Sequence, residues 1–150
     1  MKLAEALSLR KDVQKRIDQI KERLCKNVKV QEGEQPLEAP DTLFKELDAC
    51  LKQLADLVYR INQTNMMTMV DDKPLTYHMA QREVLAKRLA VLREIFNDAS
   101  SLGDRYSRTE IKQVTTIDVA KLSKNIDALS KQYRELDYKI QAVNFQTDLV

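Results

Sequence analysis

Hydrophobic residues recur every three or four positions in four stretches of this chain, and such spacing indicates amphipathic helices. We expect helices over about residues 2–27, 41–65, 75–100 and 118–144. The fourth stretch keeps a heptad step without a break, through Val119, Leu122, Ile126, Leu129, Tyr133, Leu136, Ile140 and Val143. Four long helices with this period favour an all-α, antiparallel up-down-up-down four-helix bundle. We expect residues 1–150 to form this bundle as a single domain.

Two connections between the predicted helices alternate apolar and polar residues in the way that strands do. They are residues 28–31, between the first and second helices, and residues 111–117, between the third and fourth. In an up-down-up-down bundle both connections lie at the same end, so they are candidates for a short two-stranded β ribbon. Such a ribbon is stable only when helices or another subunit cover it.

The charges of the chain are nearly balanced, with 25 Lys and Arg against 23 Asp and Glu. A net charge of +2 spread along helices does not make the basic face that a nucleic acid requires, so we expect no nucleic-acid partner. We see no export signal and no apolar window long enough for a bilayer, so we expect a cytoplasmic protein without membrane contact. Cys25 and Cys50 fit neither a zinc site nor a disulfide framework, and we expect two reduced thiols in the core.

The apolar stripes of the second and fourth predicted helices are wide enough to reach a second chain. Tyr59, Tyr133 and Tyr138 add large, partly polar surface to these helices. We therefore expect a homo-oligomer, with the number of subunits left open.

Several polar residues interrupt the inner positions of the predicted helices. In the bundle topology, the helix ends that carry them meet at one end of the molecule. The predicted polar cluster consists of Glu5, Arg10, Asn62, Asn65, His78, Arg82 and Asn144. One interpretation is that Arg10 and Arg82 pair with Glu5 or Asp137 and fix the helix register. The other is a pocket for a small anionic ligand, because two arginines can bind a carboxylate or phosphate in a forked geometry.

We find no motif that indicates catalysis. Bundles that hold two iron ions use Glu-x-x-His pairs on two helices, and this chain has none. There is also no Gly-rich phosphate loop and no recognisable nucleophile beside a base. We therefore predict no catalytic residues, no metal site and no cofactor, and we do not expect an enzyme.

Four segments of the chain resemble a small bacterial family whose members are labelled septicolysin or septicolysin-like. They are Met1–Leu7, Lys29–Glu34, Ile61–Asn65 and Asp104–Ile111. The resemblance supplies no catalytic residues, but its name implies a membrane-active toxin. The regular charges on every predicted helix are not those of a bilayer-spanning segment. Our leading hypothesis is therefore a self-associating structural or interaction protein. The alternatives are a small-ligand binder at the polar cluster and the membrane-active protein implied by the resemblance.

Overall fold

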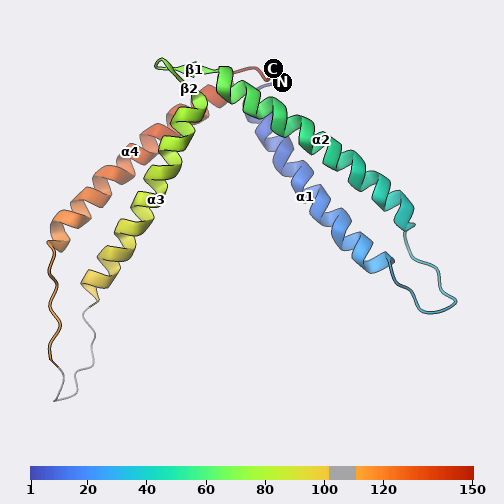
Figure 1. Cartoon of the computed structure of the whole chain (residues 1–150), viewed down its shortest axis with the longest axis horizontal. Helices are drawn as coiled ribbons and strands as arrows, with labels where there is room; N and C mark the ends of the chain where they lie inside the picture. Colours follow the sequence, from blue (N-terminus) through green and yellow to red (C-terminus); the bar gives the residue numbers. More distant parts are fainter. Residues whose placement is uncertain (102–110) are drawn as a thin grey trace. The chain divides into compact units, whose positions relative to one another are not determined.

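The computed structural model describes residues 1–101 and 111–150 of the chain. Its helices and strands are α1 (Leu3–Asn27), α2 (Pro40–Met67), β1 (Met69–Val70), β2 (Lys73–Pro74), α3 (Leu75–Ser100) and α4 (Val119–Gln146) (Figure 1). The all-α fold predicted from the heptad pattern is confirmed. Of the segment Asp104–Ile111, quoted above for the family resemblance, all but Ile111 lies outside the described residues.

The chain divides into two compact units, which we describe separately. The first comprises Met1–Pro74 and Ala142–Val150, and the second comprises Leu75–Gln141. Helix α4 therefore contributes its last turn to the first unit and the rest of its length to the second. That residues 1–150 form a single domain stays a prediction.

The first unit is built on α1 and α2, which lie side by side as an antiparallel hairpin (Figure 1). Their facing stripes form its core. The buried apolar residues of this hairpin are Leu3, Ala6, Val13, Ile20 and Leu24 of α1 and Leu43, Cys50, Leu57 and Ile61 of α2. The seven-residue steps along this list are those of a heptad seam. Both cysteines are unpaired thiols, and Cys50 is buried as predicted. Cys25 is exposed, so its predicted position in the core was wrong.

The ends of α1 and α2 are set by local chemistry. Pro40 occupies the first turn of α2, where its missing N–H would have no helical partner in any case. At the start of α1, the Lys2 backbone N–H donates to Glu5 Oε2 over 2.7 Å. This bond satisfies one of the donors that a helix leaves free at its N-terminus, and it places a negative charge in the first turn.

Residues 1–3 also pair with residues 147–149 within the first unit. The Leu3 N–H donates to the Thr147 carbonyl, and the Leu149 N–H donates to the Met1 carbonyl, both over 2.9 Å. Between them, Lys2 Nζ lies 2.9 Å from Asp148 Oδ1. The hydrogen bond from Lys2 holds the pKa of the Asp148 carboxyl below its usual value, and the positive charge of Lys2 adds to this effect.

The two-stranded sheet of this protein is not the predicted ribbon. The sheet pairs β1 with β2 antiparallel, with Met69 opposite Pro74 and Val70 opposite Lys73. Residues 28–31 and 111–117 form no strand, so that part of the prediction was wrong. Strands joined by a two-residue turn lose much less chain entropy on closure than segments about 80 residues apart. The turn residues, Asp71 and Asp72, have φ of 46° and 60°, the positive values that a tight hairpin turn requires.

The second unit is the hairpin of α3 with the part of α4 that precedes Ala142. Its buried apolar residues, among those described, are Leu75 and Leu89 of α3 and Leu129 and Ile140 of α4. The other inward-facing side chains, such as Leu85 and Leu92, stay partly exposed. This hairpin therefore covers its own apolar surface less completely than α1 and α2 cover theirs.

Candidate functional site

Five residues of the predicted polar cluster belong to the first unit, where they do not form a site of their own. Asn65 and Asn144 are buried, whereas Asn62 is exposed and Arg10 is partly exposed. Glu5 is engaged at the start of α1, as described above. In the part of the chain that the structure describes, no hydrogen bond or ion pair joins any two of these five residues.

The other two members, His78 and Arg82, lie on α3 in the second unit. The His78 ring meets the Tyr77 ring edge-on, with centroids 5.5 Å apart. Arg82 Nη1 donates to Asp137 Oδ1 of α4 over 2.5 Å, and both side chains are about two-thirds or more buried. This ion pair is one of the pairings expected in the register-fixing interpretation. It joins α3 to α4 and neutralises the charge of Arg82. Anion binding at the predicted polar cluster stays a prediction.

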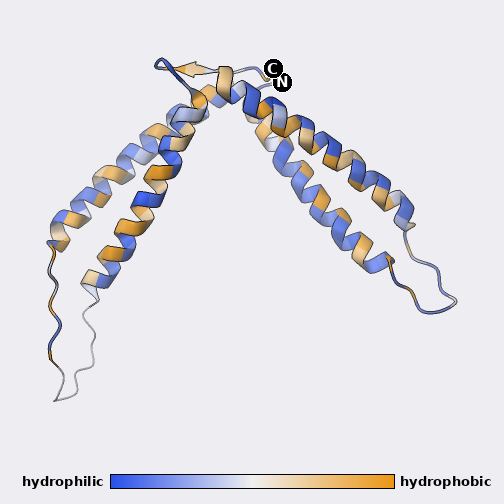
Figure 2. Ribbon diagram, in the orientation of Figure 1, coloured by the Kyte–Doolittle hydropathy of each residue, from blue (hydrophilic) through white to orange (hydrophobic). Residues whose placement is uncertain are grey.

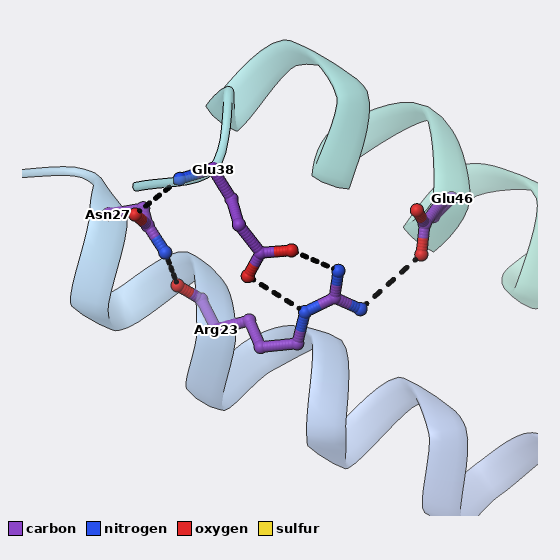
Figure 3. Close-up of polar contacts among 4 residues, drawn as sticks. All are labelled: Arg23, Asn27, Glu38 and Glu46. Carbon is purple, nitrogen blue, oxygen red and sulfur yellow. Dashed lines mark hydrogen bonds and ion pairs between the residues drawn. The ribbon is translucent and has the colours of Figure 1, made fainter. Parts of the chain in front are cut away.

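A more pronounced polar network lies where α1 passes into α2, and it was not predicted (Figure 3). Arg23 Nε donates to Glu38 Oε2 over 3.0 Å, and Arg23 Nη2 donates to the other oxygen of the same carboxylate. Arg23 Nη1 lies 3.5 Å from Glu46 Oε2 of α2. Asn27 completes the network, because its amide donates to the Arg23 carbonyl and accepts from the Glu38 N–H. The network closes the loop that connects the two helices.

The ion pair between Arg23 and Glu38 shifts the pKa of both groups. The hydrogen bond from Arg23 lowers the pKa of the Glu38 carboxyl, against the opposing effect of desolvation. The same bond raises the pKa of the Arg23 guanidinium. Each group thus favours the charged form of its partner. All of the acceptors belong to the chain itself, so the arrangement serves to hold the α1–α2 connection. The sequence signal for it was a weak one, an Arg and an Asn one turn apart at a helix end.

The second unit has a second apolar stripe, on the outer face of α3. Val84, Val91 and Ile95 are 65%, 49% and 44% exposed, although Leu89, on the inner face of the same helix, is 3% exposed. Val84 and Val91 are one heptad apart, and Ile95 follows one turn later. Hydrophobic residues therefore lie on more than one face of α3, and Figure 2 shows them along the length of the helix. A helix that is apolar on more than one face is normally covered on more than one face.

A groove runs beside this stripe, between α3 and α4. Its apolar lining comes from Val84 and Leu85 of α3 and from Leu129 and Leu136 of α4, and its volume is about 550 Å³. Polar and charged side chains edge it, Arg88 and Glu135 among them. A shallow apolar channel between two helices is the shape that another helix fills in a bundle.

The sequence pattern gave an incomplete view of this surface. We expected wide stripes on the second and fourth helices, and Tyr59 and Tyr138 on these helices are indeed exposed. The stripe on α3 was missed because Val84, Val91 and Ile95 each precede an inward-facing residue: Leu85, Leu92 and Phe96, respectively. When two neighbouring residues are both apolar, their spacing is compatible with a single helix face. Taken separately, the residues Val84, Val91 and Ile95 and the residues that follow each of them both have helical spacing, which indicates two apolar stripes on α3.

The described residues form neither a metal-binding cluster nor a membrane-spanning helix. Over residues 1–101 and 111–150, no group of three or more His, Cys, Asp or Glu is arranged to hold a metal ion. Within the same residues, none of the helices combines the length and the apolar character needed to span a bilayer.

A crystal structure of a functionally unknown conserved protein from Corynebacterium diphtheriae is similar to this chain. The two sequences are 39% identical, the TM-score is 0.94, and the match covers 100% of this chain and 99% of the other. A comparison with curated proteins finds no match.

The family assignment corrects the resemblance drawn from sequence segments. The family model that matches residues 10–149 is described as a "Family of unknown function (DUF6847)", and nothing indicates a septicolysin family. The septicolysin assignment was therefore wrong, and the membrane-active toxin that it implied loses its basis. Because the model covers nearly the whole sequence, the chain belongs to the DUF6847 family.

Proposed function

We propose that this protein is a cytoplasmic, self-associating helical protein with a structural or interaction role. The observation that carries the proposal is the apolar surface of the second unit, where Val84, Val91 and Ile95 are largely exposed beside an apolar groove. Contiguous apolar surface on a folded protein is characteristic of an interaction site. The unpaired thiols Cys25 and Cys50 suit a reducing compartment.

The energetic gain from covering this surface is large enough to matter. Completing the burial of a half-exposed Val or Ile contributes roughly 1 kcal/mol. Three such residues on each of two copies give about 6 kcal/mol, and the groove residues add to this. Association itself costs several kcal/mol in lost freedom of motion. The groove residues therefore have to supply a large share of the roughly 8 kcal/mol that a micromolar dissociation constant requires.

The role is tested by sedimentation velocity on the full chain. We expect the wild-type protein to associate at concentrations of about 10–100 µM. Val84→Glu with Val91→Glu should leave a monomer, because each copy would then have to bury two charges at the contact. Leu37→Glu is the matched control: Leu37 is an exposed residue of the α1–α2 connection, and this variant should associate as the wild type does.

Both substitutions are at exposed positions, so the helix content measured by circular dichroism should not change. A wild-type protein that stays monomeric over the whole concentration range would contradict the proposal. Association that survives the double substitution would show that another surface is responsible.

A further inference from the structure

The exposed stripe of α3 has charged neighbours that restrict what can cover it. Lys87 and Glu94 lie along one edge of the stripe, one heptad apart. Both are exposed, and neither forms an ion pair with any residue in the described part of the chain. On the other side of the stripe are Leu85 and Leu92, both partly buried, and Leu85 lines the groove between α3 and α4. The stripe therefore has one charged edge and one apolar edge.

We infer that this stripe is the contact between two copies of the chain, with their α3 helices antiparallel and a two-fold axis midway between Val84 and Ile95. The inference rests on the proposed self-association and assigns its surface and its geometry. In this arrangement Val84 lies opposite Ile95 of the second copy, and Arg88 lies opposite Val91. Lys87 of each copy then faces Glu94 of the other, so the two-fold axis generates the same charge pair twice.

The charges distinguish this register from its neighbours. Sliding one helix by one heptad in one direction would bring Lys87 opposite Lys87 of the second copy. Sliding it in the other direction would bring Glu94 opposite Glu94 of the second copy, and both arrangements place like charges together. A parallel pair would instead set Lys87 beside Leu92 of the second copy, so its charge would have no partner. Only the proposed antiparallel register, of these four, matches opposite charges along the edge.

The groove supplies the remainder of the contact. The stretch from Val84 to Ile95 is about 17 Å long at 1.5 Å per residue. A single helix face of that length falls short of the roughly 800 Å² per partner that a stable interface buries. The groove formed with Leu129 and Leu136 of α4 lies alongside and adds apolar area. Arg88 can lay its aliphatic stem on Val91 of the second copy and keep its charge at the rim, near Glu135.

Charge reversal tests the arrangement, with sedimentation equilibrium of the full chain at low salt as the measurement. Lys87→Glu gives a chain with acid at both edge positions, and Glu94→Lys gives one with base at both. Each variant alone should dimerise about tenfold more weakly than the wild type, because two attractive pairs become repulsive. The double variant Lys87→Glu/Glu94→Lys should recover the wild-type dissociation constant within about threefold.

Mixing the two single variants gives the sharpest readout. An equimolar mixture should form a heterodimer of near wild-type affinity, since acid then faces base at all four edge positions. Dissociation constants unchanged by the single substitutions, or a mixture that does not associate, would overturn the inference.

A surface control separates the inference from the proposed function. Leu51→Glu with Val58→Glu alters two of the exposed apolar positions of α2, which lie in the first unit and outside the proposed contact. This variant should dimerise normally. If it becomes monomeric while the charge variants remain dimers, self-association stands and the α3 contact is refuted. If the wild type is itself monomeric, the proposed function and this inference both fail.

Discussion

The two helical hairpins of this chain have similar lengths and similar heptad patterns, yet they differ in how well they cover their apolar residues. The α1/α2 hairpin buries an unbroken seam, from Leu3 to Leu24 on one helix and from Leu43 to Ile61 on the other. In the α3/α4 hairpin few side chains are fully buried. Apolar residues remain exposed on the outer face of α3, as Phe44, Leu51 and Val58 do on α2. A heptad pattern thus identifies helices that pack, but it does not say whether the partner helix belongs to the same chain.

The two hairpins also differ in the polar side chains that join their helices. The loop between α1 and α2 is held by Arg23, Asn27, Glu38 and Glu46. Among the described residues of the second unit, α3 and α4 are joined by the Arg82–Asp137 ion pair and by a 3.2 Å hydrogen bond from Arg93 to Ser130. The first hairpin is therefore closed by its own side chains. The second has fewer fully buried apolar residues, and Val84, Val91 and Ile95 remain exposed on α3 beside an apolar groove, which is the combination expected of an interface.

The largest effect we expect is on stability, from truncation of the core of the first hairpin. Leu43→Ala should lower the free energy of unfolding by about 3 kcal/mol, because it removes a fully buried side chain and leaves a cavity. Val84→Ala should lower it by less than about 1 kcal/mol, since Val84 is exposed in the single chain. The measurement is urea unfolding at a protein concentration too low for association.

When self-association is measured instead of stability, Val84→Ala should have the larger effect of the two substitutions. Val84→Ala should weaken self-association, and Leu43→Ala should leave it nearly unchanged in the folded protein. Equal losses of stability from both substitutions would mean that the two hairpins are covered alike, and the comparison would fail.

A smaller effect is expected from pH, through the network that closes the first hairpin. The folded-state pKa of Glu38 is lowered, so its contribution to stability is present above the unfolded-state pKa and is lost as the pH falls through the folded-state pKa. Glu38→Gln should therefore unfold at a lower urea concentration than the wild type at neutral pH. The difference should shrink in acid.

Glu34→Gln, on the same connection, is the control, because Glu34 makes no ion pair with any residue among those described. It should have the urea midpoint of the wild type throughout the pH range. A difference between Glu38→Gln and the wild type that does not change with pH would refute the assigned role of the carboxylate.

The helices could be predicted from the sequence because each has a regular heptad pattern and few helix-breaking residues. The two strands were placed wrongly, because the alternating residues 28–31 and 111–117 resembled strands more than the short, Pro-containing Lys73–Pro74 does. The decisive feature of the true ribbon is the turn at Asp71 and Asp72, which permits positive φ. That signal is local and independent of hydrophobic periodicity.

The candidate site was harder to predict than the fold, for a physical reason. The polar cluster was inferred from helix ends assumed to meet, whereas the partner of each side chain depends on distances of a few ångströms. Asp137 was correctly named as an expected partner of Arg82, because Arg82 interrupts the inner positions of α3 and Asp137 directly follows Leu136 of the α4 seam. Arg23 was missed because its acceptor, Glu38, lies in a loop where no periodicity indicates a direction. The exposure of Val84 became visible only once the packing of α3 against α4 was known.

The central claim is that a second copy of the chain covers the exposed apolar surface of α3 and α4 but not that of α1 and α2. Hydrogen–deuterium exchange at several protein concentrations tests this claim most directly. Backbone amides between Val84 and Ile95 should exchange more slowly as the concentration rises through the dissociation constant, because association stabilises that stretch of helix. Amides of α1 should exchange at the same rate throughout. Exchange in α3 that is independent of concentration, or protection that instead appears in the α1/α2 hairpin, would contradict the account.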